Sequence, residues 1–212
     1  MKLIVGNPFF QIGHTFWDGM SHHWLRKYPN LIARKQIYKS NQVWVSDITY
    51  IQIKESFAYL SLLTDAYSRK ILGHYLSDNL SREGPIEALK MAIKQKGKSF
   101  VTHHSDRGIQ YCCKDYVELL NDSFIKISMT EKGSPYENAI AERVNGILKY
   151  EFACNQTFTS FNEAKNFIDN AIKTYNGIRP HMSCNYLTPN IAHKTKEIVT
   201  RKWKSYYKEN VK

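Results

Sequence analysis

The 212-residue chain has few cysteines and no long apolar run, and each shortage excludes a class of protein. Its four cysteines form no C-x-x-C pair, and Cys112 and Cys113 are adjacent, which is poor geometry for a mutual disulfide. No stretch is apolar for long enough to span a bilayer, and the short apolar run at the N-terminus is broken by Gly6 and Pro8. We therefore expect a reduced, intracellular protein without membrane targeting.

Acidic residues are also scarce, since 19 Asp and Glu stand against 30 Lys and Arg, for a net charge of +11. This balance favours a polyanionic partner but does not separate nucleic acid from an anionic membrane surface. The last segment, residues 194–212, interleaves Lys and Arg with Trp203, Tyr206 and Tyr207. That composition suits phosphate contacts and base packing, while a solvated tail with a few docking aromatics is an equal alternative.

The hydrophobic content of 42% and aromatic content of 13% are globular values, and the length suits one α/β domain with extra segments at its ends. Residues 1–40 have weak periodicity and a likely turn at Pro29 and Asn30, so we interpret them as an N-terminal arm or linker. Their histidines, His14, His22 and His23, have no cysteine near them in the sequence, which disfavours a zinc site.

Alternating apolar and polar residues predict strands at 42–53, 57–69 and 70–78, with a turn around Asp65 to Arg69. Helical patterns follow at 81–96, 114–120, 138–152 and 160–175, where Ser160 and Glu163 form a capping box. Two further strands are expected at 100–106 and 125–130. The order strand, strand, strand, helix, strand, helix, strand, helix (βββαβαβα) predicts an α/β fold with a mixed five-stranded sheet covered by helices.

Three carboxylates stand in distinctive phrases: Asp47 in VWVSDITYI, Asp106 in HHSDRGIQY and Glu142 in SPYENAIAERVNGILKYE. Asp47 falls in an apolar row on one strand face, where a carboxylate is costly unless nearby cations compensate its charge. Asp106 follows a strand end. Two aspartates and a glutamate are ligands that Mg²⁺ prefers, and metal-held carboxylates serve phosphodiester cleavage and transfer.

Glu142 and Lys149 are seven residues apart and therefore share one helical face, with Asn138 and Asn145 flanking them. Lys149 is placed to bind a phosphate near the metals. Each feature has an ordinary alternative, because an Asp at a strand end is often a turn residue and a Glu and Lys on one helix face are often a solvated stripe.

Other polar residues compete for a role at this site. Asp65 is a candidate fourth carboxylate, but a turn-stabilising role with Ser68 and Arg69 is favoured. His104 shares a strand face with Asp106, and packing is the preferred interpretation. Glu137 and Glu151 are rivals for the third carboxylate, but the first falls in a loop and the second points to the other side of the helix.

These phrases resemble the catalytic core of the insertion-sequence-3 family of bacterial transposases, which is related to retroviral-type integrases. The resemblance runs from about residue 41 to 193 and includes the D-x-x-S-R phrase at 65–69 and YNGIRPHMSCNYLTP at 175–189. It implies a ribonuclease-H-like fold and carries the catalytic and metal-binding triad onto Asp47, Asp106 and Glu142. It also carries the basic residue seven positions after the glutamate onto Lys149.

The resemblance implies a DNA transposase that uses Mg²⁺ or Mn²⁺, two ions in our interpretation, for strand nicking and strand transfer. Element ends and target DNA are the expected partners, with self-association on DNA and a cytoplasmic, nucleoid-associated location. The predicted DNA contacts are one set of polar residues: Lys149, Arg143, Asn145, Asn138, Lys132 and Arg107. The predicted organisation is an arm at 1–40, a core at 41–193 and a basic tail at 194–212.

The chain departs from many relatives at Glu137 and Arg143, where Asp and Ser are usual, and both substitutions keep the triad intact. Residues 1–40 are too short for the helix-turn-helix region that precedes the core in full-length relatives, so we expect a truncated copy or one frame of a longer product. Two alternatives stay open at this point: a nuclease of the same fold that only hydrolyses, and a non-catalytic DNA-binding fragment.

Overall fold

A computed structural model describes residues 23–33, 35–131 and 138–195. Its sheet has five strands, β1 (Val43–Ile53), β2 (Ser56–Asp65), β3 (Ile71–Ser77), β4 (Thr102–Ser105) and β5 (Lys126–Met129). Their order is β3-β2-β1-β4-β5. The first three strands form an antiparallel meander, and β4 and β5 extend it in parallel with β1.

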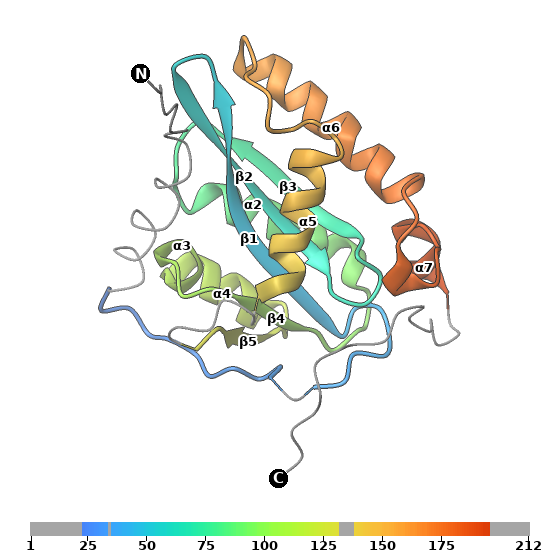
Figure 1. Cartoon of the computed structure of the whole chain (residues 1–212). Coiled ribbons are helices and arrows are strands. Elements are labelled where there is room, and N and C mark those ends of the chain that lie inside the picture. The colour runs from blue at the N-terminus through green and yellow to red at the C-terminus, as the bar shows by residue number, and fades with distance from the viewer. Residues whose placement is uncertain (1–22, 34, 132–137, 196–212) are drawn as a thin grey trace, which may run out of the picture.

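Helices cover both faces of the sheet (Figure 1). They are α2 (Glu83–Lys96), α3 (Ile109–Cys112), α4 (Lys114–Asp122), α5 (Ala139–Tyr150), α6 (Phe161–Gly177) and α7 (Pro189–Lys194), with a 3₁₀ turn at Met182–Cys184. α2, α3 and α4 lie on one face, whereas α5 and α6 lie on the other. The arrangement is the mixed five-stranded α/β sheet that the sequence pattern predicts, and it is the ribonuclease-H-like fold that the resemblance implies.

Successive side chains of each strand point to opposite faces of the sheet, so the core is divided into separate apolar clusters. Trp44 and Ile48 of β1 point to the face covered by α2 and α4. Ile51 and Ile53 point to the face covered by α5 and α6. Because β1 is central and buried on both faces, its register also decides which face receives Asp47.

Most predicted element boundaries are confirmed within a few residues, and the differences have local causes. The helix expected from Ser81 begins at Glu83, and its N-cap residue is Arg82, which makes no side-chain capping bond. The Ser81 hydroxyl still accepts a hydrogen bond from the Glu83 amide at 3.3 Å. The cap at Ser160 is confirmed, since its hydroxyl accepts from the Glu163 amide at 3.2 Å.

The four cysteines, all within the described ranges, are free thiols, as expected for a reduced protein. Of the helices in the described ranges, none combines the length and the apolar character that a bilayer crossing requires. The described part of the segment at 1–40 packs against the core. Its Leu25 and Tyr28 contact the cluster beneath α4, and Ile32 and Ile37 contact Val43 and its neighbours.

Candidate active site

Asp47 lies in the middle of β1, opposite Leu62 of β2, on the face that α5 covers. Its Oδ1 accepts a hydrogen bond from the Ile48 amide at 2.9 Å, and its Oδ2 accepts one from Asn145 Nδ2 at 2.7 Å. Burial raises the pKa of Asp47 to about 7, and the negative charges of Asp106 and Glu142 add to this rise. The carboxylate is therefore held in place while its charge is only partly compensated.

Asp106 follows the end of β4, which runs parallel to β1 and pairs with it. Its Oδ1 accepts from the Gly108 amide at 2.8 Å, and burial raises its pKa. A Cβ added at Gly108 would lie 2.9 Å from that same oxygen, so a larger residue would displace the carboxylate. The D-x-G spacing thus keeps the side chain of Asp106 beside that of Asp47.

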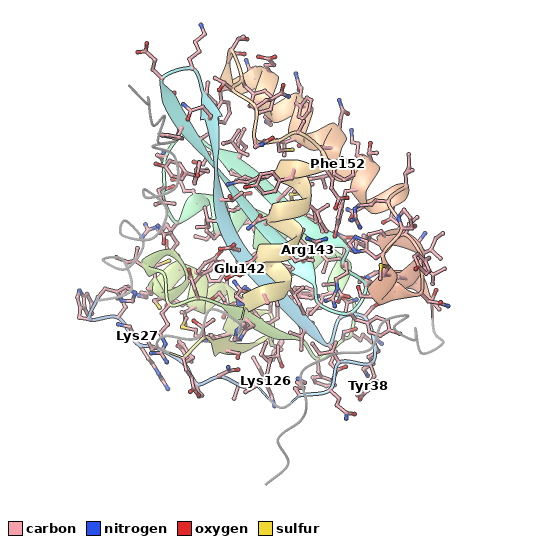
Figure 2. All side chains as sticks on the ribbon, viewed as in Figure 1. Lys27, Tyr38, Lys126, Glu142, Arg143 and Phe152 are labelled. Atoms are coloured by element: carbon pink, nitrogen blue, oxygen red, sulfur yellow. The ribbon has the colours of Figure 1, made fainter. Side chains whose placement is uncertain are left out.

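Glu142 lies exposed in the first turn of α5, where Figure 2 labels it on the left side of the helix. Burial raises its pKa, and its charge in turn raises that of Asp47. Lys149 lies two turns further along α5 with its Nζ 4.0 Å from the centre of the Tyr50 ring. Burial lowers the pKa of Lys149 and the charge of Asp47 raises it, so the predicted common face of Glu142 and Lys149 is directed to the β1 carboxylate.

The two asparagines of α5 have internal partners. Asn138 is buried at the N-cap and donates from Nδ2 to the Ser46 carbonyl at 3.0 Å, which fixes the start of α5 against β1. Asn145 is buried and holds Asp47. Both were predicted to contact DNA, and that role stays a prediction beside the positioning role that the geometry gives them.

The remaining predicted DNA contacts are placed differently. Arg143 is exposed on α5, on the other side of the helix from Glu142 in Figure 2, and its charge helps to lower the pKa of Glu151. Arg107 follows Asp106 and is half-buried, and its carbonyl accepts from His23 Nε2 at 2.9 Å in the tautomer that protonates this nitrogen. Lys132 lies outside the described residues, as does Glu137.

The rival carboxylates are occupied elsewhere. Asp65 is fully buried, and its Oδ1 accepts from the amide and the hydroxyl of Ser68 at 2.8 and 2.7 Å. Glu151 pairs with Arg179 through two bonds of 2.6 and 2.8 Å, which lowers the pKa of Glu151. The turn role favoured for Asp65 is confirmed, and neither residue is free to join Asp47.

His104 is fully buried, with its Nδ1 2.8 Å from the Ser128 hydroxyl of the neighbouring strand. This contact confirms the prediction of a packed histidine.

The donor chemistry of the site fits a hard divalent cation. Asp47 and Asp106 are two mutually repelling carboxylates with raised pKa values. Within the described ranges, no three His, Cys, Asp or Glu side chains lie close enough together to form a cage for a metal ion, so Glu142 does not join the two aspartates as a third ligand in this structure. Mg²⁺ does not require such a cage, because it is commonly bound through one or two carboxylates together with water and phosphate oxygens.

Sequence reasoning missed two contributors to this geometry. Tyr50 supplies the aromatic face beneath Lys149, and nothing in the strand pattern indicates it, since Tyr50 points away from Asp47 in a regular strand. Gly108 was not singled out, although its position two residues after Asp106 is a usable signal for a carboxylate that accepts a backbone bond.

Comparisons with known proteins agree with this geometry. Two models of the integrase core domain match, one over residues 37–135 and the other over residues 123–189. Together they cover β1 to β5, α5 and the segment that follows α6, and they include all three candidate carboxylates.

Several curated relatives come from insertion sequences. A 31 kDa protein of insertion element IS600 from Shigella sonnei is 36% identical over 172 residues, which are 80% of this chain and 63% of that protein. Transposase InsF of insertion sequence IS3A from Escherichia coli K12 is 35% identical over 70% of this chain and 52% of its own length. The chain thus spans about half to two thirds of these relatives.

Solved structures share the fold at low identity. The HTLV-2 integrase catalytic core domain in complex with magnesium, in its trimeric form, has a TM-score of 0.58 at 22% identity, over 75% of this chain and 99% of that one. A chain of the simian T-cell lymphotropic virus intasome has a TM-score of 0.65 at 20% identity, over 81% of this chain and 60% of that one. The chain therefore belongs to the integrase core domain family, among the relatives of the insertion-sequence-3 transposases.

Proposed function

We propose that this chain is the catalytic core of a DNA transposase that nicks DNA and joins the freed 3′ end to another phosphodiester. One observation carries the proposal: Asp47 holds a carboxylate in the apolar face of β1, beside Asp106 and within the field of Glu142. An arrangement that raises the pKa of Asp47 to about 7 destabilises the metal-free fold, which is typical of a site built to receive cations. The insertion-sequence relatives support the reaction class.

Asp47, Asp106 and Glu142 would hold the divalent cations, Mg²⁺ or Mn²⁺. Bound cations of this kind lower the pKa of water and stabilise charge on the transferring phosphoryl group. HTLV-2 integrase, a structural neighbour, is described in complex with magnesium. Asp47 comes from β1, Asp106 follows the adjacent parallel strand β4, and Glu142 comes from α5, which packs on β1, so the three carboxylates would approach a bound phosphate from different elements.

The surrounding residues orient the carboxylates and the DNA. Asn145 donates a hydrogen bond to Oδ2 of Asp47 and so orients this carboxylate. Lys149, stacked over Tyr50, is a cation beside Asp47 that would bind the phosphate adjacent to the scissile bond. Arg143 is exposed on the other side of α5, near Glu151, so it would contact phosphates away from the scissile bond.

Transposition requires two element ends to be held together, so we also propose self-association on DNA. The simian virus neighbour is part of an intasome. The strand-transfer assay described below also tests whether the chain needs a further DNA-recognition part. For this purpose it is run on DNA with and without the terminal repeats of the element.

The test is a nicking and strand-transfer assay with labelled duplex, in Mg²⁺ and in EDTA. Asp47→Asn, Asp106→Asn and Glu142→Gln should each reduce product by roughly a thousandfold, as expected when a group acting on the transition state is removed. Asp122→Asn, on an exposed turn of α4 away from the site, is the matched control and should retain full activity.

Product analysis separates the transposase from its alternatives. Joined strands support the proposal, whereas cleavage without joining would identify a hydrolytic nuclease. Full activity of any of the three variants would remove that residue from the mechanism. DNA binding without cleavage in any metal would reject catalysis altogether.

A further inference from the structure

The segment before β1 has an unusual charge. Residues 23–40, named the arm here, hold five Lys or Arg and no Asp or Glu. Arg34 is one of these five and lies outside the described residues. The arm also holds Trp24, Tyr28 and Tyr38, so its cations are interleaved with aromatic rings.

The arm is docked along β5, the edge strand of the sheet (Figure 1). The Met129 amide donates to the Pro29 carbonyl at 3.4 Å, and the Leu31 amide donates to the Ser128 hydroxyl at 2.8 Å. Leu25 and Ile32 are partly buried against the core. The arm is therefore held to the sheet by backbone and apolar contacts, to which Lys35 adds one hydrogen bond to Thr102.

Two cations of the arm, Arg26 and Lys39, face outward. Arg26 lies over the Tyr28 ring at 5.0 Å, and Lys39 lies over the Tyr38 ring at 5.8 Å. Both cationic residues are exposed, as is Trp24 at 93%. No ion pair found within the described ranges involves an arm cation.

Lys126 of β5 adds to this charge. Lys35 donates to the Thr102 hydroxyl at 2.9 Å, and burial together with the neighbouring charge of Lys126 lowers the pKa of Lys35. Two ammonium groups held close enough to repel each other fit an anion placed against both. Figure 2 shows Lys27, Lys126 and Tyr38 in succession along this lower edge of the molecule.

One end of the arm touches the candidate active site. His23 Nε2 lies 2.9 Å from the carbonyl of Arg107, the residue after Asp106. The basic surface therefore begins beside the second aspartate and leads away from it along β5.

We propose that the arm and Lys126 form a track for the phosphate backbone of duplex DNA, separate from the contacts of α5. The track would hold the duplex that leads away from the cleaved phosphodiester. The proposal rests on the proposed function only in naming DNA as the polyanion. Phosphate contacts of this kind position a duplex without reading its sequence.

Anisotropy titrations of labelled duplex against salt test the track. The full chain carries Asp47→Asn and is kept in EDTA, so that binding is measured without cleavage. Each phosphate contact contributes about 0.9 to the slope of log K against log salt. Arg26→Gln, Lys35→Gln and Lys39→Gln together should therefore lower the slope by about 2 to 3, and Lys126→Gln alone by about 1.

The matched control replaces three exposed lysines of α2 and α6, Lys94, Lys165 and Lys173, by Gln. Its net charge change is the same, and its slope should stay at the parent value. Equal slope changes in both triple variants would overturn the track, as would no binding of DNA by the parent chain. Should the arm triple unfold, Lys126→Gln decides the question, because that exposed side chain takes no part in docking the arm.

Failure of the track and failure of the proposed function give different results. If the parent chain nicks and joins DNA but the arm variants keep the parent's salt slope, the proposed function holds and the track is rejected. If the parent chain never cleaves DNA but the arm variants lower the salt slope, the track holds and the proposed function is rejected.

Discussion

At the scale of single residues, Asp47 is the least favourable choice for folding and the most informative for function. A carboxylate in the apolar face of a central strand costs free energy, and its only described side-chain hydrogen-bond donor is Asn145. The neighbouring acid Asp106 adds to that cost. Residues that destabilise the fold where they sit are typical of active sites.

This cost predicts a stabilised variant. The folded-state pKa of Asp47 is about 7 and its ordinary value is 3.8, so ionisation favours the unfolded state between these two values. The loss of folding free energy caused by ionised Asp47 is absent at a pH below its ordinary pKa and complete at a pH above its folded-state pKa. Asp47→Asn should therefore raise the Tm of the metal-free protein by about 3 °C or more at pH 8, and by less at pH 5.

Calorimetry in EDTA and in Mg²⁺ checks this prediction. Mg²⁺ should raise the Tm of the parent chain but leave Asp47→Asn nearly unchanged, because the variant lacks a metal-binding carboxylate. The Asn145 amide can rotate and accept from the new Asn, so no hydrogen-bonding group is lost. A lower Tm for the variant at pH 8 would mean that the carboxylate is already compensated in the fold.

At the scale of elements, the contact between α2 and β3 depends on a missing side chain. A Cβ at Gly73 of β3 would lie 1.9 Å from the Ala88 carbonyl oxygen of α2. That atom is backbone, so the helix itself would have to move. The strand pattern at 70–78 gives no sign of this requirement, because glycine in a strand is also compatible with a bulge.

Two matched substitutions test the contact. Gly73→Ala should cost about 3 kcal/mol or more, since α2 has to separate from the sheet. Gly146→Ala, on α5 where no atom lies within 4 Å of the added Cβ, should stabilise by about 0.5–1 kcal/mol through helix propensity. Urea unfolding curves measure the change in unfolding free energy for both variants. Equal changes in the two variants would show that α2 can move away from β3 without cost.

At the scale of the whole molecule, one buried network joins three segments that are far apart in the sequence. Asp65 Oδ2 accepts from the Asn41 amide at 2.7 Å, and Asp65 Oδ1 accepts from Ser68. The Ser68 hydroxyl also lies 3.0 Å from Nδ1 of His193 in α7. The network thus ties the entry to β1, the turn between β2 and β3, and the last described helix.

Removing its centre should loosen all three segments together. Asp65→Ala leaves two buried amides and a hydroxyl without their acceptor, so we expect a loss of about 3 kcal/mol or more. Hydrogen exchange should show faster exchange at residues 41, 68 and 190–194 in the same variant. Asp78→Ala, an exposed aspartate beyond β3, is the control and should leave exchange unchanged.

Much of the architecture follows from local patterns. Alternation in residues 42–53 places Asp47 on a strand face, and 3.6-residue periodicity places Glu142, Asn145 and Lys149 on one side of α5. Local patterns did not reveal that Asn145 bonds Asp47, nor that Tyr50 supports Lys149. Those contacts join residues nearly a hundred positions apart, and their existence depends on how α5 crosses β1.

The sequence by itself predicted the three carboxylates, through the phrases that resemble the transposase family. It also determined the order of strands and helices and the excess of positive charge, because these depend on residue type and short-range periodicity. Only the tertiary structure decided that Asp47, Asp106 and Glu142 share one electrostatic field, and that the arm lies against β5 with its end beside Asp106. The physical reason is that strand pairing and helix packing bring distant segments together. Burial then sets the pKa values and the free charges that local spacing leaves undefined.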